Sequence, residues 1–186
     1  MLEQFNIALF ILINQYAGIN PILDSSAVLI AHYMPIPFII GLLYFFHKGN
    51  KYREITLLSI YAAVFGLAAN VVIWHFYFHP RPFMIPVGTL LFPFPPYTSF
   101  PSDHTTFMLS IALIMIYFKE TRKFGALFII LGLVGGFSRV FCGIHFPLDI
   151  FGGIIIAIII TAVIYYFRDT FSSFNHILKL IYYVLK

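Results

Sequence analysis

Charged residues and cysteine are both scarce in this sequence. Of its 186 residues, 10% are charged, 61% are hydrophobic and 19% are aromatic. Soluble domains carry about 25% charged residues, and a soluble fold of this length cannot bury so much apolar surface. The single cysteine, Cys142, excludes an intrachain disulfide and a cysteine-cluster metal site. The composition predicts a membrane protein built as one domain, residues 1–186.

Long apolar runs predict an all-α, polytopic membrane bundle with about five transmembrane helices. The runs lie near residues 26–46, 55–78, 103–118, 124–142 and 147–167. The first contains Pro35 and Pro37 and is expected to be kinked. The apolar core at 7–13 is too short to span, so we expect an interfacial anchoring helix there, or a short sixth span. The basic tail, 168–186, is expected to be a surface helix.

The cations predict an orientation. The net charge is +4, but the cations lie in connections and form no basic stripe, which argues against nucleic-acid binding. Five spans put the loops 48–53 and 119–123 and the tail on one side, and only Arg81 and Arg139 on the other. The positive-inside rule predicts that the cation-rich side is cytoplasmic and that the two arginines face outward.

The connection between the last two runs holds three ionisable groups. Arg139 ends one run, and Asp149 begins the next, four residues after His145. Residues four apart share a helix face, so Asp149 is placed to accept a hydrogen bond from one ring nitrogen and leave the other free as a nucleophile. Arg139 offers a planar fork for a phosphate. Taken alone, the His–Asp pair is equally consistent with a helix cap.

Two other polar stretches border apolar runs. Ser102 is a suitable N-cap for the third run, and Pro101 fixes its entry. Free amides at a helix start bind phosphate, and His104 is placed in the first turn to donate a proton. Arg81 follows the second run, within a Pro-rich connector at 79–102 that we expect to cover the site.

These stretches together resemble the three-part signature of the type 2 phosphatidic acid phosphatase superfamily: Arg81-Pro82, Pro101-Ser102-Asp103-His104, and Ser138-Arg139 followed by His145 and Asp149. Asp103 replaces the family's usual Gly. With Thr105-Thr106 after it, this variant resembles the bacterial undecaprenyl-diphosphatase branch, of the bacitracin-resistance type. One departure stands out: Trp74 occupies the place of the family's first lysine. His75, His79 and the backbone are the open candidates to replace that cation.

The resemblance implies a lipid phosphatase without metal or cofactor. In that scheme His145 attacks phosphorus and forms a phosphohistidine, Asp149 orients its ring, and His104 protonates the leaving oxygen. The phosphate-binding roles fall to Arg81, Arg139, Pro101, Ser102, Asp103 and Ser138. The implied substrate is undecaprenyl diphosphate in a bacterial plasma membrane, and membrane lipids are the other partners. For the Asp103 side chain two places are open: a hydrogen bond to a neighbour, or a position beside a second phosphate or a cation.

Two kinds of alternative are open: another lipid substrate for the same kind of enzyme, and a protein that is not an enzyme. Phosphatidylglycerophosphate, phosphatidate and lipid A are substrates of the same superfamily. A transporter of anionic lipids would use the same cations, but transporters usually show internal repeats, and this sequence has none. A metal site is disfavoured because His75 and His79 have no third ligand at helical spacing.

Overall fold

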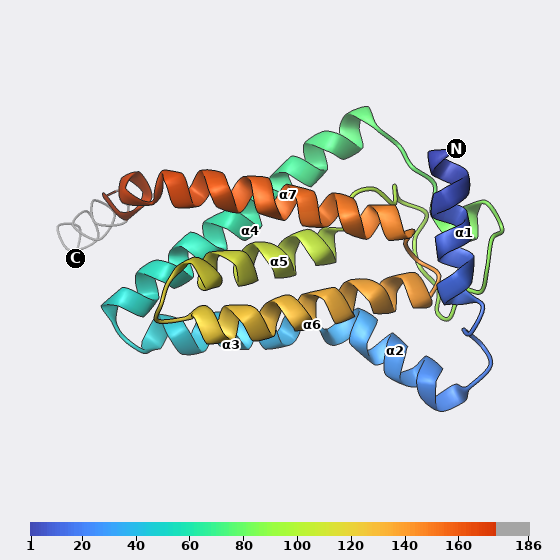
Figure 1. Cartoon of the computed structure of the whole chain (residues 1–186), viewed down its shortest axis with the longest axis horizontal. Helices are drawn as coiled ribbons and strands as arrows, with labels where there is room; N and C mark the ends of the chain where they lie inside the picture. Colours follow the sequence, from blue (N-terminus) through green and yellow to red (C-terminus); the bar gives the residue numbers. More distant parts are fainter. Residues whose placement is uncertain (174–186) are drawn as a thin grey trace.

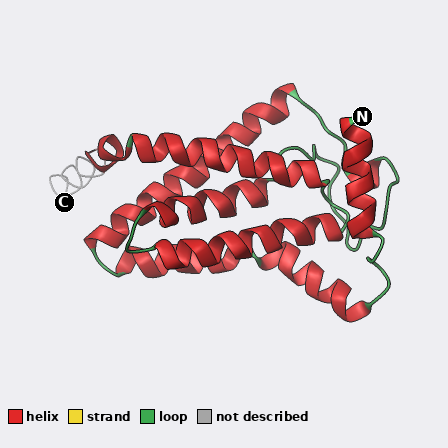
Figure 2. Cartoon of the chain, viewed as in Figure 1, coloured by secondary structure: helices red, strands yellow, loops and turns green. Residues whose placement is uncertain are grey.

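The structure is a computed structural model that describes residues 1–173. Within this range every regular element is a helix (Figure 2). The elements are α1 (Leu2–Asn14), α2 (Pro21–Tyr33), α3 (Pro35–His47), α4 (Asn50–Phe76), the short 3-10 helix η1 (Pro82–Met84), α5 (Asp103–Tyr117), α6 (Arg122–Phe141) and α7 (Pro147–Tyr166). The predicted all-α class is confirmed. The predicted surface helix at 168–186 lies mostly outside the described residues.

Prolines set several of these boundaries. Pro21, Pro35 and Pro147 each stand in the first turn of a helix, where the missing N–H costs no hydrogen bond. At Pro35 the first predicted span breaks into α2 and α3, which meet at an angle of 42°. The expected kink is therefore confirmed. Helix α4 ends at Phe76, so His79 lies in the connector and does not share a helix face with His75.

The chain is a multi-pass membrane protein. Helices α4, α6 and α7 are long and apolar enough to cross a membrane, and α2 with α3 gives a fourth span if the bent pair is counted as one. Helix α5 has 15 residues, or about 22 Å, which is shorter than the ~30 Å hydrocarbon core. It packs against α4, α6 and α7 in the middle of the bundle (Figure 1). Its polar backbone is therefore covered by protein along much of its length.

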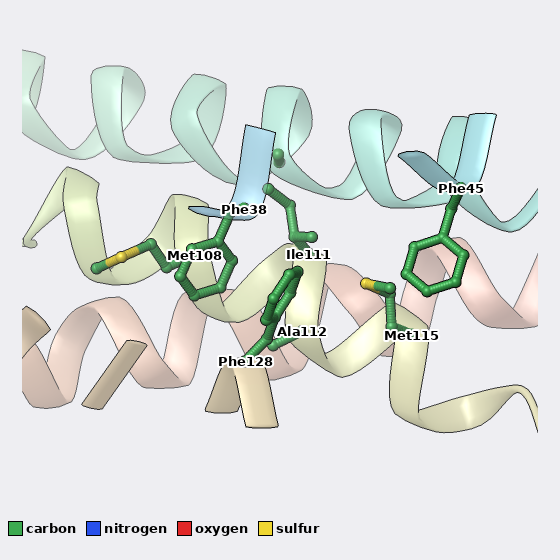
Figure 3. Close-up of a cluster of buried hydrophobic side chains, with 8 residues drawn as sticks. Phe38, Phe45, Met108, Ile111, Ala112, Met115 and Phe128 are labelled. Atoms are coloured by element: carbon green, nitrogen blue, oxygen red, sulfur yellow. The ribbon is translucent and has the colours of Figure 1, made fainter. Parts of the chain in front are cut away.

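The bundle is held by side chains that meet around α5. Figure 3 shows Met108, Ile111, Ala112 and Met115 of α5 against aromatic rings from α3 and α6. The rings of Phe38 and Phe128 lie 4.5 Å apart between centroids. Because lipid is as apolar as these side chains, close packing rather than exclusion from water favours this contact.

All three motif blocks lie at one end of the bundle. The α3–α4 and α5–α6 turns lie at the opposite end (Figure 1). Helix α1 runs across the motif end, with Phe5 and Leu12 exposed and Phe10 buried. Its Asn14 donates to the carbonyls of Thr89 and Phe141 and accepts from the Thr89 amide. The sequence predicted an anchoring helix or a short sixth span, whereas α1 also contacts the connector and the end of α6.

Candidate active site

His145 and Asp149 meet as the spacing predicts. Nδ1 of His145 lies 3.3 Å from Oδ2 of Asp149. Both residues are buried, with 2% of His145 and 0% of Asp149 exposed. The carboxylate fixes the ring proton on Nδ1, so Nε2 carries the free electron pair. Burial lowers the pKa of His145 to about 4, so the imidazole is neutral at neutral pH. It has the protonation state of a nucleophile.

Asp149 makes several further contacts in the site. Its Oδ2 also accepts from the backbone N–H of Phe146, at 2.7 Å, and from the hydroxyl of Ser99. Its backbone carbonyl accepts from the N–H of Ser102 at 3.0 Å. Sequence reasoning missed Ser99, because a serine within a Pro-rich connector carries no local signal of this contact. The carboxylate is therefore held by the residue before α7 and by the connector, and the backbone of Asp149 is bound to the start of α5.

Arg81 lies beside the nucleophile. Its Nη1 is 3.3 Å from Nε2 of His145, and the same nitrogen donates to the carbonyl of Ile144 at 2.7 Å. Nε and Nη2 donate to the carbonyls of Tyr97 and Thr98. Burial lowers the pKa of Arg81 only to about 10, so the guanidinium stays charged at neutral pH. The backbone carbonyls of the connector thus hold the Arg81 guanidinium next to Nε2 of His145.

Arg139 approaches from α6 and shares an aromatic neighbour with Arg81. The ring of Phe94 lies 4.5 Å from the guanidinium carbon of Arg81 and 5.5 Å from that of Arg139. Arg139 donates through Nη1 to the carbonyl of Ala31 at the end of α2. Its buried Nε has no hydrogen-bond partner within residues 1–173. This N–H is free to bind an anion.

The start of α5 faces the same space. The imidazole of His104 is half-buried and interacts electrostatically with His145, Arg139 and Arg81. Ser102 is the N-cap residue, but its side chain makes no capping hydrogen bond, so the predicted cap is correct in position only. Its hydroxyl accepts instead from Thr105, and helix-start amides are left without a side-chain acceptor.

Asp103 has a structural partner. Its Oδ1 accepts from Nδ2 of Asn70 at 2.8 Å, and Asn70 also donates to the hydroxyl of Thr106. Asn70 thus forms a polar link between α4 and the first turn of α5. Trp74 follows one helical turn later on α4. Its indole N–H is buried and unpaired within the described chain.

Two glycines allow the backbones of the site to approach closely. A Cβ at Gly153 would lie 2.9 Å from the carbonyl oxygen of Ser102, so α7 contacts the start of α5 only with glycine there. Gly143 has φ +81° and turns the chain from α6 toward His145. A Cβ there would lie 2.2 Å from the carbonyl oxygen of Thr89.

Two other candidates from the sequence have different surroundings. The Ser138 hydroxyl donates to the Gly135 carbonyl of its own helix, and Pro101 is buried before α5. Burial raises the pKa of the Cys142 thiol to about 12, as befits a packing residue. Within residues 1–173 no three His, Cys, Asp or Glu side chains group in the manner of a metal site.

The chain is similar to known proteins. Residues 53–173 match the PAP2 superfamily. The chain is 35% identical to undecaprenyl-diphosphatase BcrC of Bacillus subtilis (strain 168), over 95% of this chain and 91% of that protein. It is 31% identical to the putative undecaprenyl-diphosphatase YbjG of Escherichia coli (strain K12), over 86% and 80%.

A solved structure is also similar. The crystal structure of Aquifex aeolicus LpxE matches with a TM-score of 0.72 and 30% sequence identity, covering 86% of this chain and 94% of that chain. The three motif blocks of the sequence lie within the matched residues 53–173, whereas α1, α2 and α3 precede them. The extent of the match and the identity to these relatives establish that the chain belongs to the PAP2 superfamily.

Proposed function

We propose that this protein hydrolyses the terminal phosphate of undecaprenyl diphosphate. The observation that carries the proposal is the buried, neutral His145 at one end of an apolar bundle. Asp149 holds its Nδ1, and its free Nε2 faces Arg81. Two relatives named as undecaprenyl-diphosphatases, one of them putative, support this choice of substrate. The products are undecaprenyl phosphate and inorganic phosphate, so the reaction regenerates a lipid carrier used in cell-wall synthesis.

The chemistry proceeds in two displacements. Nε2 of His145 attacks the terminal phosphorus, and the bond from phosphorus to the bridging oxygen breaks. His104, which becomes an imidazolium beside the anionic diphosphate, gives its proton to that oxygen. His104 then removes a proton from water, which attacks the phosphohistidine and breaks the P–N bond. Because His145 arrives neutral and gains positive charge in the first step, the Asp149 carboxylate stabilises the intermediate.

The cations hold the transferred group. Arg81 and Arg139 supply guanidinium N–H groups to the equatorial oxygens, where negative charge accumulates. The amides at the start of α5, near Ser102 and Asp103, add neutral donors. The Phe94 ring lies against both guanidiniums, so it borders the space that the phosphate enters.

We also propose that the site faces outward across a bacterial plasma membrane. The cationic loops around Lys48 and Lys119 lie at the end of the bundle opposite the motif residues, and such loops favour the cytoplasmic side. A thiol reagent that cannot cross membranes tests this in intact cells: Tyr97→Cys should be labelled and Lys119→Cys should not. The reverse pattern contradicts the orientation.

Phosphate release by purified protein in detergent tests the reaction. Undecaprenyl diphosphate, phosphatidate and phosphatidylglycerophosphate are compared with excess EDTA present, for the wild type, His145→Ala and the control His75→Ala. His75 is exposed and lies outside the site. We expect preference for the prenyl substrate, no effect of EDTA, and a loss of about 10³-fold or more in His145→Ala alone. Release that survives His145→Ala refutes the phosphohistidine route, and preference for a glycerolipid moves the substrate assignment to that lipid.

A further inference from the structure

Asp149 has a second imidazole beside it. We propose that His79 is a positioning residue for Asp149, and that Glu3 on α1 holds His79 in place. The inference rests on the proposed function, in which Asp149 orients the nucleophile. It extends the working site beyond the three motif blocks and into the N-terminal helix, which precedes the residues matched to the superfamily.

Each carboxylate oxygen of Asp149 faces one histidine. Oδ2 lies 3.3 Å from Nδ1 of His145, and Oδ1 lies 3.4 Å from Nδ1 of His79. Oδ1 of Asp149 and Nδ1 of His79 are both buried, and neither has a hydrogen-bond partner elsewhere in the described part of the chain. Two buried polar atoms without other partners would be costly unless they satisfy one another. We therefore interpret the 3.4 Å contact between Nδ1 of His79 and Oδ1 of Asp149 as an ion pair.

The other side of His79 is held by α1. Nε2 of His79 lies 3.4 Å from Oε2 of Glu3, 76 residues away in sequence. The His79 amide donates to the Thr98 hydroxyl, and the His79 carbonyl accepts from the amide of Ser99. The rings of Phe146 and Tyr77 flank the imidazole at 5.5 and 6.2 Å. His79 is thus fixed on both backbone and ring, between one carboxylate from α1 and one from α7.

The charges favour an imidazolium at this position. The nearby Asp149 carboxylate raises the pKa of His79 above its usual 6.5, Glu3 adds to this, and burial opposes it. The other ionisable groups around Asp149 are His145, which is neutral, and Arg81. A cation on Oδ1 keeps the fully buried Asp149 ionised and leaves Oδ2 to accept from His145. The lone pair on Nε2 of His145 then stays directed at phosphorus.

The test compares His79→Gln, Glu3→Gln and the control His75→Gln with the wild type. Phosphate release from undecaprenyl diphosphate and from phosphatidate is measured between pH 6 and pH 9, with kcat and KM separated. We expect His79→Gln to lower kcat about 10- to 100-fold with little change in KM. In Glu3→Gln the loss should grow with pH, because removing the carboxylate lowers the pKa of His79 and the imidazolium is lost earlier. The control should follow the wild type.

A melting series separates this inference from the proposed function. A raised folded pKa gives His79 a stabilising contribution that is full below pH 6.5 and is lost as pH rises through the folded pKa. The difference in melting temperature between wild type and Glu3→Gln should therefore shrink from pH 6 to pH 9. A wild type inactive on both lipids refutes the proposed function, and the melting series then still decides whether Glu3, His79 and Asp149 are coupled. Activity losses that are equal at every pH, or a melting difference independent of pH, overturn the inference.

Discussion

Asn14 offers the sharpest test of how α1 supports the site. Its side chain makes three hydrogen bonds: Nδ2 to the Thr89 carbonyl at 2.9 Å, Nδ2 to the Phe141 carbonyl at 2.8 Å, and Oδ1 from the Thr89 amide at 2.6 Å. Asn14→Ala removes all three. At about 1 kcal/mol net for each bond, the loss is about 3 kcal/mol. A protein of this size loses about 2–4 °C of melting temperature per kcal/mol.

We therefore expect Asn14→Ala to melt about 6–12 °C below the wild type in the same detergent. Asn14→Asp keeps the acceptor for the Thr89 amide but sets a buried carboxylate oxygen against the carbonyls of Thr89 and Phe141, so it should melt no higher than Asn14→Ala. Gln15→Ala is the matched control, because within residues 1–173 the exposed Gln15 side chain donates to the carbonyl of Leu12 alone. If Asn14→Ala melts within about 2 °C of the control, α1 does not brace the site and the reasoning fails.

Three further predictions concern the site itself. Gly153→Ala should lower the melting temperature by the equivalent of about 1–3 kcal/mol, because its Cβ would meet the Ser102 carbonyl at 2.9 Å. Arg81→Lys should lower kcat/KM about 100-fold or more, since one ammonium cannot reach three connector and loop carbonyls and a phosphate; activity near wild type would contradict this. His145 has a folded pKa of about 4, so it should cost stability progressively as pH falls from 6.5 toward 4. The melting temperature of His145→Gln should then fall less steeply over this range than that of the wild type.

The helices were largely predictable because their ends carry local signals. Pro35 and Pro147 stand in first turns, and the apolar runs between them set both helix type and length. The pairing of His145 with Asp149 was equally accessible, since four residues make one helical turn. The prediction of a phosphate site at one end followed from the same local reasoning.

The rest of the site depends on contacts between distant residues. Ser99 reaches Asp149 across 50 positions, and Glu3 reaches His79 across 76. Asn6 accepts from the amide of Leu148 at the start of α7, 142 positions away. No periodicity or spacing encodes such contacts, so α1 was predicted as an anchoring helix or a short sixth span, with no contact to the site. The same reason explains Ser102, whose position as N-cap is local but whose hydroxyl is used by Thr105.

The separation of the two ends of the bundle has a practical consequence for labelling. The α3–α4 and α5–α6 turns lie away from every catalytic candidate (Figure 1), and Lys51 pairs with Glu120 there at 2.6 Å. A fluorophore, an epitope or a rigid fusion partner placed at these turns would leave the chemistry untouched. The buried Cys142 would not compete for thiol reagents. Such a handle suits single-molecule work and adds mass for electron microscopy of a small membrane protein.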